Sequence, residues 1–125
     1  MRRIVAAAMA ATLVISACGG GGAGGGAGPA AELGPAVETS EVSLEDRKFV
    51  PASIMVAAGT TVTWSNKDRM AHTVTSGVPR ARDRRFDRTL SPGTGTFTFT
   101  FEEPGVYTYF CQFHPATMLG QVEVK

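Results

Sequence analysis

The sequence predicts an all-β fold, a Greek-key antiparallel β-sandwich of about seven short strands. Apolar and polar residues alternate with a period of two in "TTVTWSN" and "TFTFTF", while helical periodicity is hard to find. Valine, threonine, phenylalanine and tyrosine are enriched in these stretches, as is typical of strands. Turn signals such as "SNKD", "SPGTG" and "EEPG" separate them, at the spacing expected of a sandwich.

The expected strands follow the alternation along the chain. One starts at His72, where a loop runs into a strand, and the others cover residues 41–44, 53–59, 60–66, 96–101, 106–111 and 121–124. The stretch "SGVPRARDRRFDRTLSPG" shows no strand pattern, so we expect a long connection across one edge. In "VYTYFC" the alternation turns Tyr107, Tyr109 and Cys111 to one face, with Cys111 pointing inward at the end of the sandwich. Tyr107 follows a proline turn, which resembles the tyrosine corner of Greek-key sandwiches.

Residues 1–17 differ from the rest and are predicted to be a signal peptide. Arg2 and Arg3 precede an uncharged stretch of 14 residues, "IVAAAMAATLVISA". That stretch is shorter than the roughly 20 residues that span a bilayer. A basic start, a short apolar segment and small residues before a break are typical of a secretory signal.

The end of this segment, "VISAC", resembles the lipobox of bacterial lipoproteins. The resemblance implies that Cys18 becomes a lipidated N-terminus. The lipid would anchor an exported protein either to the outer face of the cell membrane or to a membrane surface that faces the periplasm. The alternative is a buried or disulfide-bonded cysteine. Residues 18–37 then form a Gly/Ala/Pro-rich flexible tether, and residues 38–125 form one folded domain. The formal charge of +1 gives no indication of nucleic-acid binding.

One short loop near the C-terminus, in "YTYFCQFHPATMLG", carries three kinds of metal-binding side chain. Cys111, His114 and Met118 offer a thiolate, an imidazole and a thioether, which suit copper better than calcium or magnesium. If Cys18 carries lipid, Cys111 has no disulfide partner. The only other histidine in the chain is His72. Packing beneath the loop is the alternative reading of Met118.

Two histidines, one cysteine and a weak thioether form the blue-copper arrangement. The chain resembles the cupredoxins, the plastocyanin and amicyanin group in particular, from "FVPASIMVAAGTTVTWSNKD" through "AHTV" to "FTFTFEEPGVYTYFCQFHPATMLGQVEV". The resemblance implies one type 1 copper held by four ligands, His72, Cys111, His114 and Met118. The chain departs from the family at Thr73, where asparagine is frequent, and in the three residues between His114 and Met118.

The resemblance also implies a function, that of a one-electron carrier between redox protein partners, and we expect a monomer. The alternative is a copper-binding lipoprotein that buffers or delivers copper. We do not expect an enzyme, because the domain is too short for the second domain and additional histidines of multicopper enzymes. Two polar features remain open. Asn66 either bonds across to the ligand loop or only shapes a turn. The arginines of residues 80–88 either dock an acidic partner or anionic lipid, or simply face water.

Overall fold

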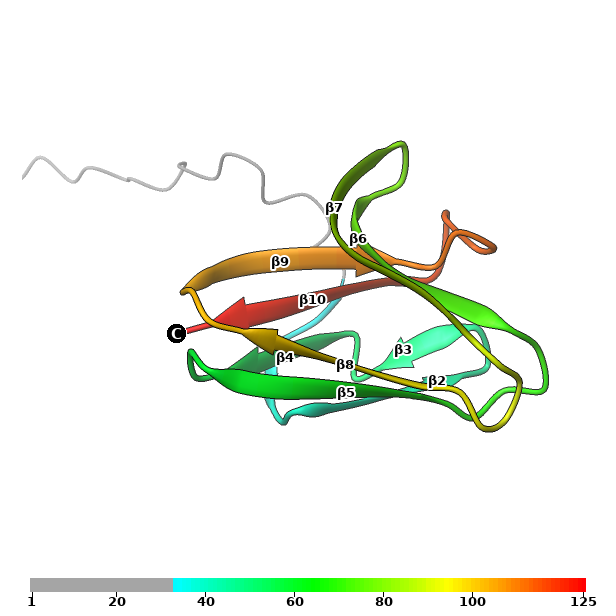
Figure 1. The fold of residues 1–125 in the computed structure, drawn as a ribbon, viewed down its shortest axis with the longest axis horizontal. Helices are drawn as coiled ribbons and strands as arrows, with labels where there is room; N and C mark the ends of the chain where they lie inside the picture. Colours follow the sequence, from blue (N-terminus) through cyan, green and yellow to red (C-terminus); the bar gives the residue numbers. More distant parts are fainter. Residues whose placement is uncertain (1–32) are drawn as a thin grey trace, which may run out of the picture.

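The computed structural model describes residues 33–125, which form two β-sheets packed face to face (Figure 1). One sheet has six strands, in the spatial order β1 (Val37–Glu38), β4 (Ser53–Val56), β10 (Leu119–Val124), β9 (Gly105–Phe110), β6 (His72–Val78) and β7 (Ala81–Leu90). The other has four, in the order β3 (Lys48–Val50), β2 (Glu41–Glu45), β5 (Thr60–Asn66) and β8 (Thr96–Phe101). The predicted all-β sandwich is confirmed. No helix among the described residues is long and apolar enough to cross a membrane.

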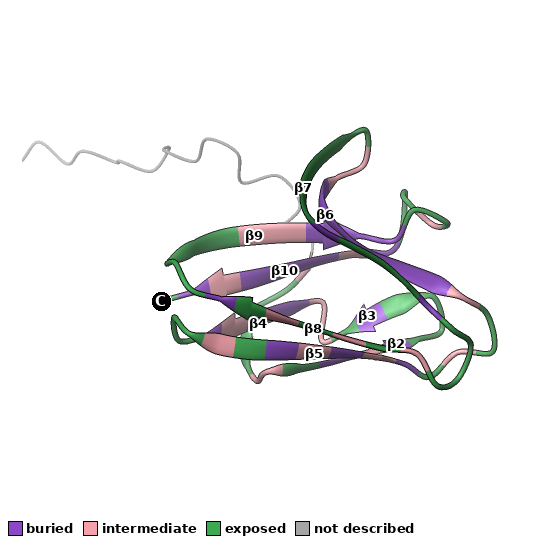
Figure 2. Cartoon of the chain, viewed as in Figure 1, coloured by how far each residue is buried: buried purple, intermediate pink, exposed green. Residues whose placement is uncertain are grey.

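Alternating side chains build the core between the sheets. Figure 2 shows buried segments on the facing strands of both layers. Trp64 of β5 is fully buried, with ring centroids 5.4 Å from both Phe97 and Tyr109. Offset and edge-on packing at these distances adds about 0.5–1.5 kcal/mol per aromatic pair to the burial of apolar surface. The aromatic face predicted for "TFTFTF" is therefore part of the core, through Phe97, Phe99 and Phe101.

The sheets differ from the prediction in strand number and direction. The described residues contain ten strands rather than about seven, because β1 and β3 have only two and three residues and are too short to show alternation. Three pairings are parallel, β1 with β4, β10 with β4 and β2 with β5, so both sheets are mixed. Alternation reports which face is buried but not the direction of the neighbouring strand.

The prediction of a long connection that starts at residue 76 is wrong, because most of that stretch forms β7. This strand pairs along β6 on the edge of the larger sheet, with a register shift between Thr75 and Gly77. Only Phe86 and Leu90 of its ten residues are buried. An edge strand with both faces largely in water needs no period-two pattern, and charged side chains there discourage pairing with other chains.

The turn from β8 into β9 contains the predicted tyrosine corner. The Tyr107 hydroxyl donates a hydrogen bond to the carbonyl oxygen of Glu103, 2.7 Å away. This bond fixes the start of β9, which runs from exposed residues at Gly105 to buried ones at Phe110 (Figure 2). The strand thus carries Cys111 to the opposite end of the sandwich, in the interior as predicted.

Three connections meet at that end, on the right of Figure 1. They are the β2–β3 turn, the β5–β6 loop before His72 and the β9–β10 loop from Cys111 to Met118, which we call the ligand loop. The predicted signal peptide and Cys18 lie outside the described residues. The predicted tether ends at residue 37, whereas β1 already begins at Val37.

Candidate metal centre

The ligand loop is closed by its own backbone. The N–H of Cys111 donates to the carbonyl of Met118 at 3.0 Å, so the two ends of the loop lie side by side. Within the loop, the N–H groups of His114 and Met118 donate to the carbonyls of Cys111 and His114, at 3.2 and 2.9 Å. These turns gather a thiol, an imidazole and a thioether within eight residues of chain.

His72 enters this cluster from the first residue of β6. Its Nδ1 lies 3.8 Å from Cys111 Sγ, and its ring centroid lies 5.3 Å from that of His114. His72, Cys111 and Met118 have no solvent exposure, whereas His114 is half-buried. The structure therefore brings together His72, Cys111 and His114, and buries Met118 beside the Cys111 backbone.

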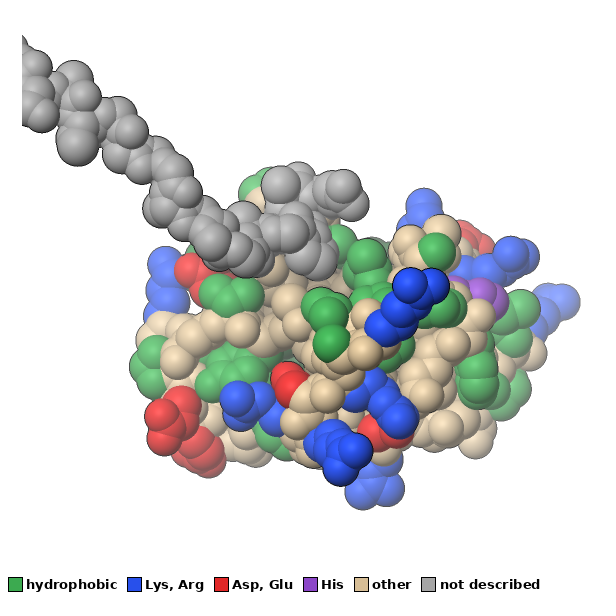
Figure 3. All heavy atoms as spheres, turned by 90° about the horizontal axis from the view of Figure 1, so that it is seen from above, with side chains coloured by type: hydrophobic (Ala, Val, Ile, Leu, Met, Phe, Trp, Pro, Cys, Tyr) green, Lys and Arg blue, Asp and Glu red, His purple; other side chains and the backbone are tan. Residues whose placement is uncertain are grey.

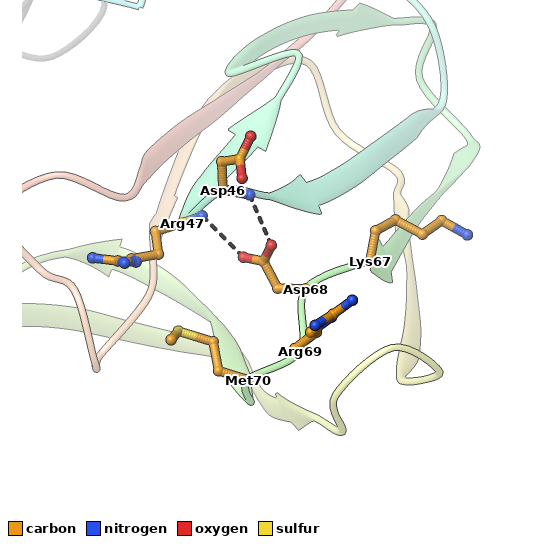
Figure 4. A pocket seen from close by; sticks show the side chains of 6 residues that line it. All are labelled: Asp46, Arg47, Lys67, Asp68, Arg69 and Met70. Atoms are coloured by element: carbon orange, nitrogen blue, oxygen red, sulfur yellow. Dashed lines mark hydrogen bonds between the residues drawn. The ribbon is translucent and has the colours of Figure 1, made fainter.

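Asp68 holds the outer edge of His72. The Nε2–H of His72 donates to Asp68 Oδ2 at 2.6 Å, so its Nδ1 keeps a free lone pair on the side facing Cys111. The same carboxylate accepts the backbone N–H groups of Asp46 and Arg47, at 2.8 and 2.9 Å (Figure 4). Burial would raise the pKa of Asp68, but the hydrogen bonds from Arg47, His72 and Asp46 hold that pKa below its ordinary value.

The β2–β3 turn is shaped to make these bonds. Asp46 and Arg47 both have positive φ angles, 49° and 59°, as in the two-residue hairpin turn that best fits strand twist. Glycine and asparagine are favoured at such positions. Here the conformation aims two successive N–H groups at one carboxylate, and charge-assisted hydrogen bonds of about 1.5–3 kcal/mol each offset its cost.

Asn66 does not reach the ligand loop. Its Nδ2 lies 2.9 Å from the carbonyl oxygen of Met70 and 3.1 Å from that of Leu90, and its Oδ1 accepts the N–H of Asp68. It is fully buried. Asn66 therefore shapes the loop that carries Asp68 to His72, which is closer to the turn role than to the cross-loop bond.

Thr73 and Gln112 tie the ligand loop to β6. The N–H of Thr73 points at Cys111 Sγ, with nitrogen and sulfur 3.3 Å apart, and the Thr73 hydroxyl oxygen accepts the N–H of Gln112 at 2.8 Å. Gln112 Nε2 donates to Thr75 Oγ1 and Asp87 Oδ1, both at 3.0 Å. At the position where the family often has asparagine, Thr73 thus supplies both a donor to the sulfur and an anchor for the loop.

This set of donors fits a copper ion. A buried thiol, an imidazole with a free Nδ1 and a thioether are soft or borderline ligands, and the N–H donor at the sulfur suits a thiolate. Among residues 33–125, no three His, Cys, Asp or Glu side chains stand close enough together to hold an ion as they are. Closing the two nitrogens and the sulfur around one ion therefore requires an adjustment of these side chains. The fit rests on donor chemistry and on the His72–Cys111 approach.

Sequence reasoning missed Asp68 and Gln112. Asp68 stands four residues before His72 in "NKDRMAH", a stretch interpreted only as a turn. A carboxylate that close to a candidate metal-binding histidine is the signal that was available, because ligand histidines donate their other N–H to a carboxylate, a backbone carbonyl or water. Gln112 had no signal beyond its place after Cys111.

Comparisons with known proteins agree with the fold and with copper as the ion. Residues 36–125 match the family of copper binding proteins of the plastocyanin/azurin type. The chain is 31% identical over 96 residues to amicyanin-alpha of Methylorubrum extorquens, covering 77% of this chain and 79% of that protein. A solved purple cupredoxin from Nitrosopumilus maritimus is similar, with TM-score 0.62 and 31% identity over 70% of this chain and 100% of that one.

A longer protein also contains this fold. The Cu-containing nitrite reductase from Thermus scotoductus matches with TM-score 0.59 and 25% identity, over 71% of this chain but 22% of that one. With a family match over residues 36–125 and a ligand loop that gathers thiolate, imidazole and thioether against a buried histidine, the chain belongs to the copper-binding plastocyanin/azurin family, the cupredoxins.

Proposed function

We propose that this protein is a membrane-anchored, mononuclear type 1 copper protein that carries single electrons between redox protein partners. The observation that carries the proposal is the approach of His72 Nδ1 to Cys111 Sγ at 3.8 Å, both side chains fully buried, with the half-buried His114 beside them. Family membership supports copper as the ion.

The residues that would hold copper are His72 through Nδ1, Cys111 through Sγ, His114 through its ring and Met118 through its thioether. Copper supplies one-electron redox chemistry when bound. The chain's part is to keep its own geometry constant, because a site that moves little on electron gain or loss transfers electrons with a small barrier. The hydrogen bond that His72 donates to Asp68 and the one that Cys111 Sγ accepts from the N–H of Thr73 restrict both ligands.

Electrons are proposed to enter and leave through His114. His72 is covered by the body of the protein, whereas His114 is half-buried and its loop neighbours Phe113, Pro115 and Ala116 are exposed, Phe113 by 55%. A small apolar surface around the ring edge excludes water and permits the weak, fast docking that a carrier needs.

The test is the visible spectrum of the copper-loaded protein. We expect intense absorption from thiolate-to-copper charge transfer, which bleaches on reduction and returns on reoxidation. Cys111→Ser should abolish the colour while the far-ultraviolet circular dichroism stays that of a β-sandwich. Cys18→Ser is the matched control, because it removes the other cysteine and should leave the colour intact. A blue Cys111→Ser protein would refute the assignment.

Redox cycling of the copper-loaded protein distinguishes an electron carrier from a copper-delivering protein. A carrier should retain its copper through repeated cycles of reduction and oxidation in the presence of a chelator. Loss of copper to the chelator after the first reduction would favour delivery instead.

The anchor is proposed from "VISAC" alone, and Cys18 lies outside the described residues. Cells fed a labelled fatty acid should label the wild-type protein and not Cys18→Ala, and the wild-type protein should sediment with membranes. An unlabelled wild-type protein would remove the anchor and leave the copper function standing.

A further inference from the structure

The β6–β7 hairpin places an arginine at its tip, close to the ligand loop. The tip is the turn from Val78 to Ala81, where Arg80 has a φ of 72°. Glycine adopts such a conformation most easily, and a larger side chain costs about 1–2 kcal/mol. In Figure 1 the hairpin rises from the larger sheet beside the connection between β9 and β10.

A hollow lies between this hairpin and the ligand loop. Its volume is about 350 Å³, and it is lined by Pro79 and Arg80 on one side, Pro115 and Ala116 on the other, and Phe110. A second hollow continues past Phe110 between Arg80, Arg82 and Gln112. The lining is thus apolar at the centre and cationic along the hairpin wall.

The hairpin wall contacts Gln112, the residue that follows Cys111. Arg82 Nη1 lies 3.5 Å from the side-chain oxygen of Gln112, whose amide nitrogen donates to Asp87 of β7 at 3.0 Å. Gln112 directly follows Cys111, and Ala116 lies two residues after His114. A molecule seated in the hollow therefore sits beside the segments that carry both ligands.

Charge is distributed unevenly along the molecule. On the other flank of the ligand loop, Arg47 and Lys48 line a hollow with Thr117 and Asp46. Figure 3 shows the histidine at the right-hand end, bordered by hydrophobic and basic side chains. The opposite end carries Glu102 and Glu103 in the β8–β9 turn. Basic side chains therefore line the hollows on both flanks of the ligand loop, Arg80 and Arg82 on one flank and Arg47 and Lys48 on the other.

The carboxylates next to the hairpin arginines do not prevent these arginines from binding a partner. Arg82 and Asp87 lie 3.5 Å apart, Arg85 and Asp83 lie 3.6 Å apart, and all four side chains are between 40% and 55% exposed. Exposed pairs of this kind contribute about 0–1 kcal/mol, so a second carboxylate can compete for the arginines.

We propose that the hollow between Arg80, Arg82 and the ligand loop is the docking surface for a redox protein that presents an acidic face. This inference rests on the proposed electron-carrier function and adds the chemistry of the partner. Carboxylates of the partner meet Arg80 and Arg82, and an apolar side chain enters between Pro79 and Pro115. Phospholipid headgroups form a flat anionic layer, which fits a concave surface less well than a protruding acidic segment does.

The test uses one heme protein in two charge states, native cytochrome c with its basic surface and the same protein with its lysines succinylated. Stopped-flow measurement with the copper-loaded full chain gives the second-order rate constant for each probe. In Arg80→Glu/Arg82→Glu we expect the rate with the acidic probe to fall at least tenfold and its decrease with added salt to disappear, while the basic probe reacts faster. The visible spectrum should be unchanged.

The matched control is Arg85→Glu/Lys125→Glu, which makes the same change of charge elsewhere. The Arg85 guanidinium lies over Tyr107, 5.0 Å from its ring centroid, and Lys125 ends the chain beyond β10. This variant should keep at least half of the wild-type rate with the acidic probe. If the rate with the acidic probe falls equally in both double variants, the net charge of the protein alone controls that rate. This result would overturn the proposed docking surface.

Two further outcomes count against the proposal in different ways. In the first outcome, Arg80→Glu/Arg82→Glu reacts with both probes at the wild-type rates, but its preference for phosphatidylglycerol over phosphatidylcholine vesicles is weaker than that of the wild type. The arginines would then bind an anionic membrane surface and not a protein partner. If wild-type protein exchanges electrons with neither probe, the carrier function fails, and the docking surface fails with it. The first result leaves the carrier function intact, so the two failures are distinguishable.

Discussion

At the scale of single residues, Asp68 joins the proposed metal centre to the other sheet. Its two oxygens accept hydrogen bonds from His72 and from the backbone of Asp46 and Arg47, which lie in the turn between β2 and β3. A carboxylate bound to a ligand histidine fixes the ring and raises its basicity. The position of His72 is therefore set by a turn more than 20 residues earlier in the chain.

Replacing Asp68 with asparagine should weaken metal binding. Asparagine offers one acceptor oxygen where Asp68 uses two, and it removes the negative charge beside His72. We expect affinity for Zn²⁺, measured by competition with a chelator, to fall by about tenfold to hundredfold. The reduction potential of the copper form should rise, because the oxidised ion loses more stabilisation than the reduced one.

Asp46→Asn is the control for this change. It removes the same charge from the neighbouring turn, keeps the backbone N–H that Asp68 accepts, and introduces a residue that tolerates positive φ. Its Zn²⁺ affinity should stay within threefold of wild type. An equal loss in both variants would reduce the role of Asp68 to that of a surface charge.

Met118→Leu tests whether the thioether is a ligand. Leucine fills a similar volume and keeps the loop packed, so the colour should remain. Because a thioether donates some density to the oxidised ion, its removal should raise the reduction potential. Cyclic voltammetry that gives an unchanged potential would show that Met118, which is fully buried, only packs under the loop.

At the residue scale, sequence reasoning recovered what depends on side-chain type. Cys111, His114 and Met118 are close in the chain, so their proximity could be predicted, and His72 is the only other histidine. The ligand assignment itself stays a prediction. Asp68 could not be found by that reasoning, because its bond to His72 depends on a turn supplied by another part of the chain.

At the scale of elements, the pairing of β9 with β10 depends on one glycine. Gly120 lies opposite Tyr109, and a Cβ at position 120 would overlap the Tyr109 ring. That ring is itself fixed, with centroid distances of 4.7 Å to Phe49 and 5.4 Å to Trp64. Moving the Tyr109 ring away from a new Cβ would disturb these two contacts.

Gly120→Ala should therefore destabilise the fold. Overpacking of this kind costs about 1–3 kcal/mol, because side chains must leave their preferred rotamers. Urea unfolding of the metal-free protein, followed by Trp64 fluorescence, gives the free energy of unfolding. A value equal to that of wild type would mean that the two strands separate slightly at no cost.

Some strands could be predicted from the sequence and others could not. β5 and β8 each have one face in the core, so their alternation predicted them well. β7 was missed because it is an edge strand whose only inward side chains, Phe86 and Leu90, are four residues apart. The parallel pairings were missed because period-two patterning carries no information about strand direction.

At the scale of the whole molecule, the proposed metal centre and the core share residues. Cys111 and Met118 belong to the same buried cluster as Trp64 and Tyr109. Binding at the centre therefore stabilises the domain as a whole, since an ion that binds only the folded chain shifts the folding equilibrium.

Thermal unfolding should reveal this coupling. With free Zn²⁺ at about 100 times its dissociation constant, the free energy of unfolding should rise by about 2.7 kcal/mol. Removing the ion with a chelator should restore the lower melting temperature. Cys111→Ser, used as the control, should show little response to Zn²⁺. If Zn²⁺ leaves the melting temperature of the wild-type protein unchanged, the proposed metal centre is contradicted.

The fold class was predictable because the whole domain follows one pattern, apolar residues inward and polar residues outward. Family resemblance supplied the rest, from Phe49 to Val124. What the pattern could not supply was the uneven distribution of charge, because residues such as Arg47 and Arg80 reach the same end of the molecule only through folding.

The closed ligand loop also bears on how quickly the ion can exchange. Three of the four proposed donors lie between Cys111 and Met118, in a loop held by four backbone hydrogen bonds of its own. Opening that one segment would release the ion while β5, β6 and β9 stay paired, so exchange is a local event with a lower barrier than unfolding. Amide protons of the loop and the ion itself should then escape at matching rates, both faster than the amide protons of β5.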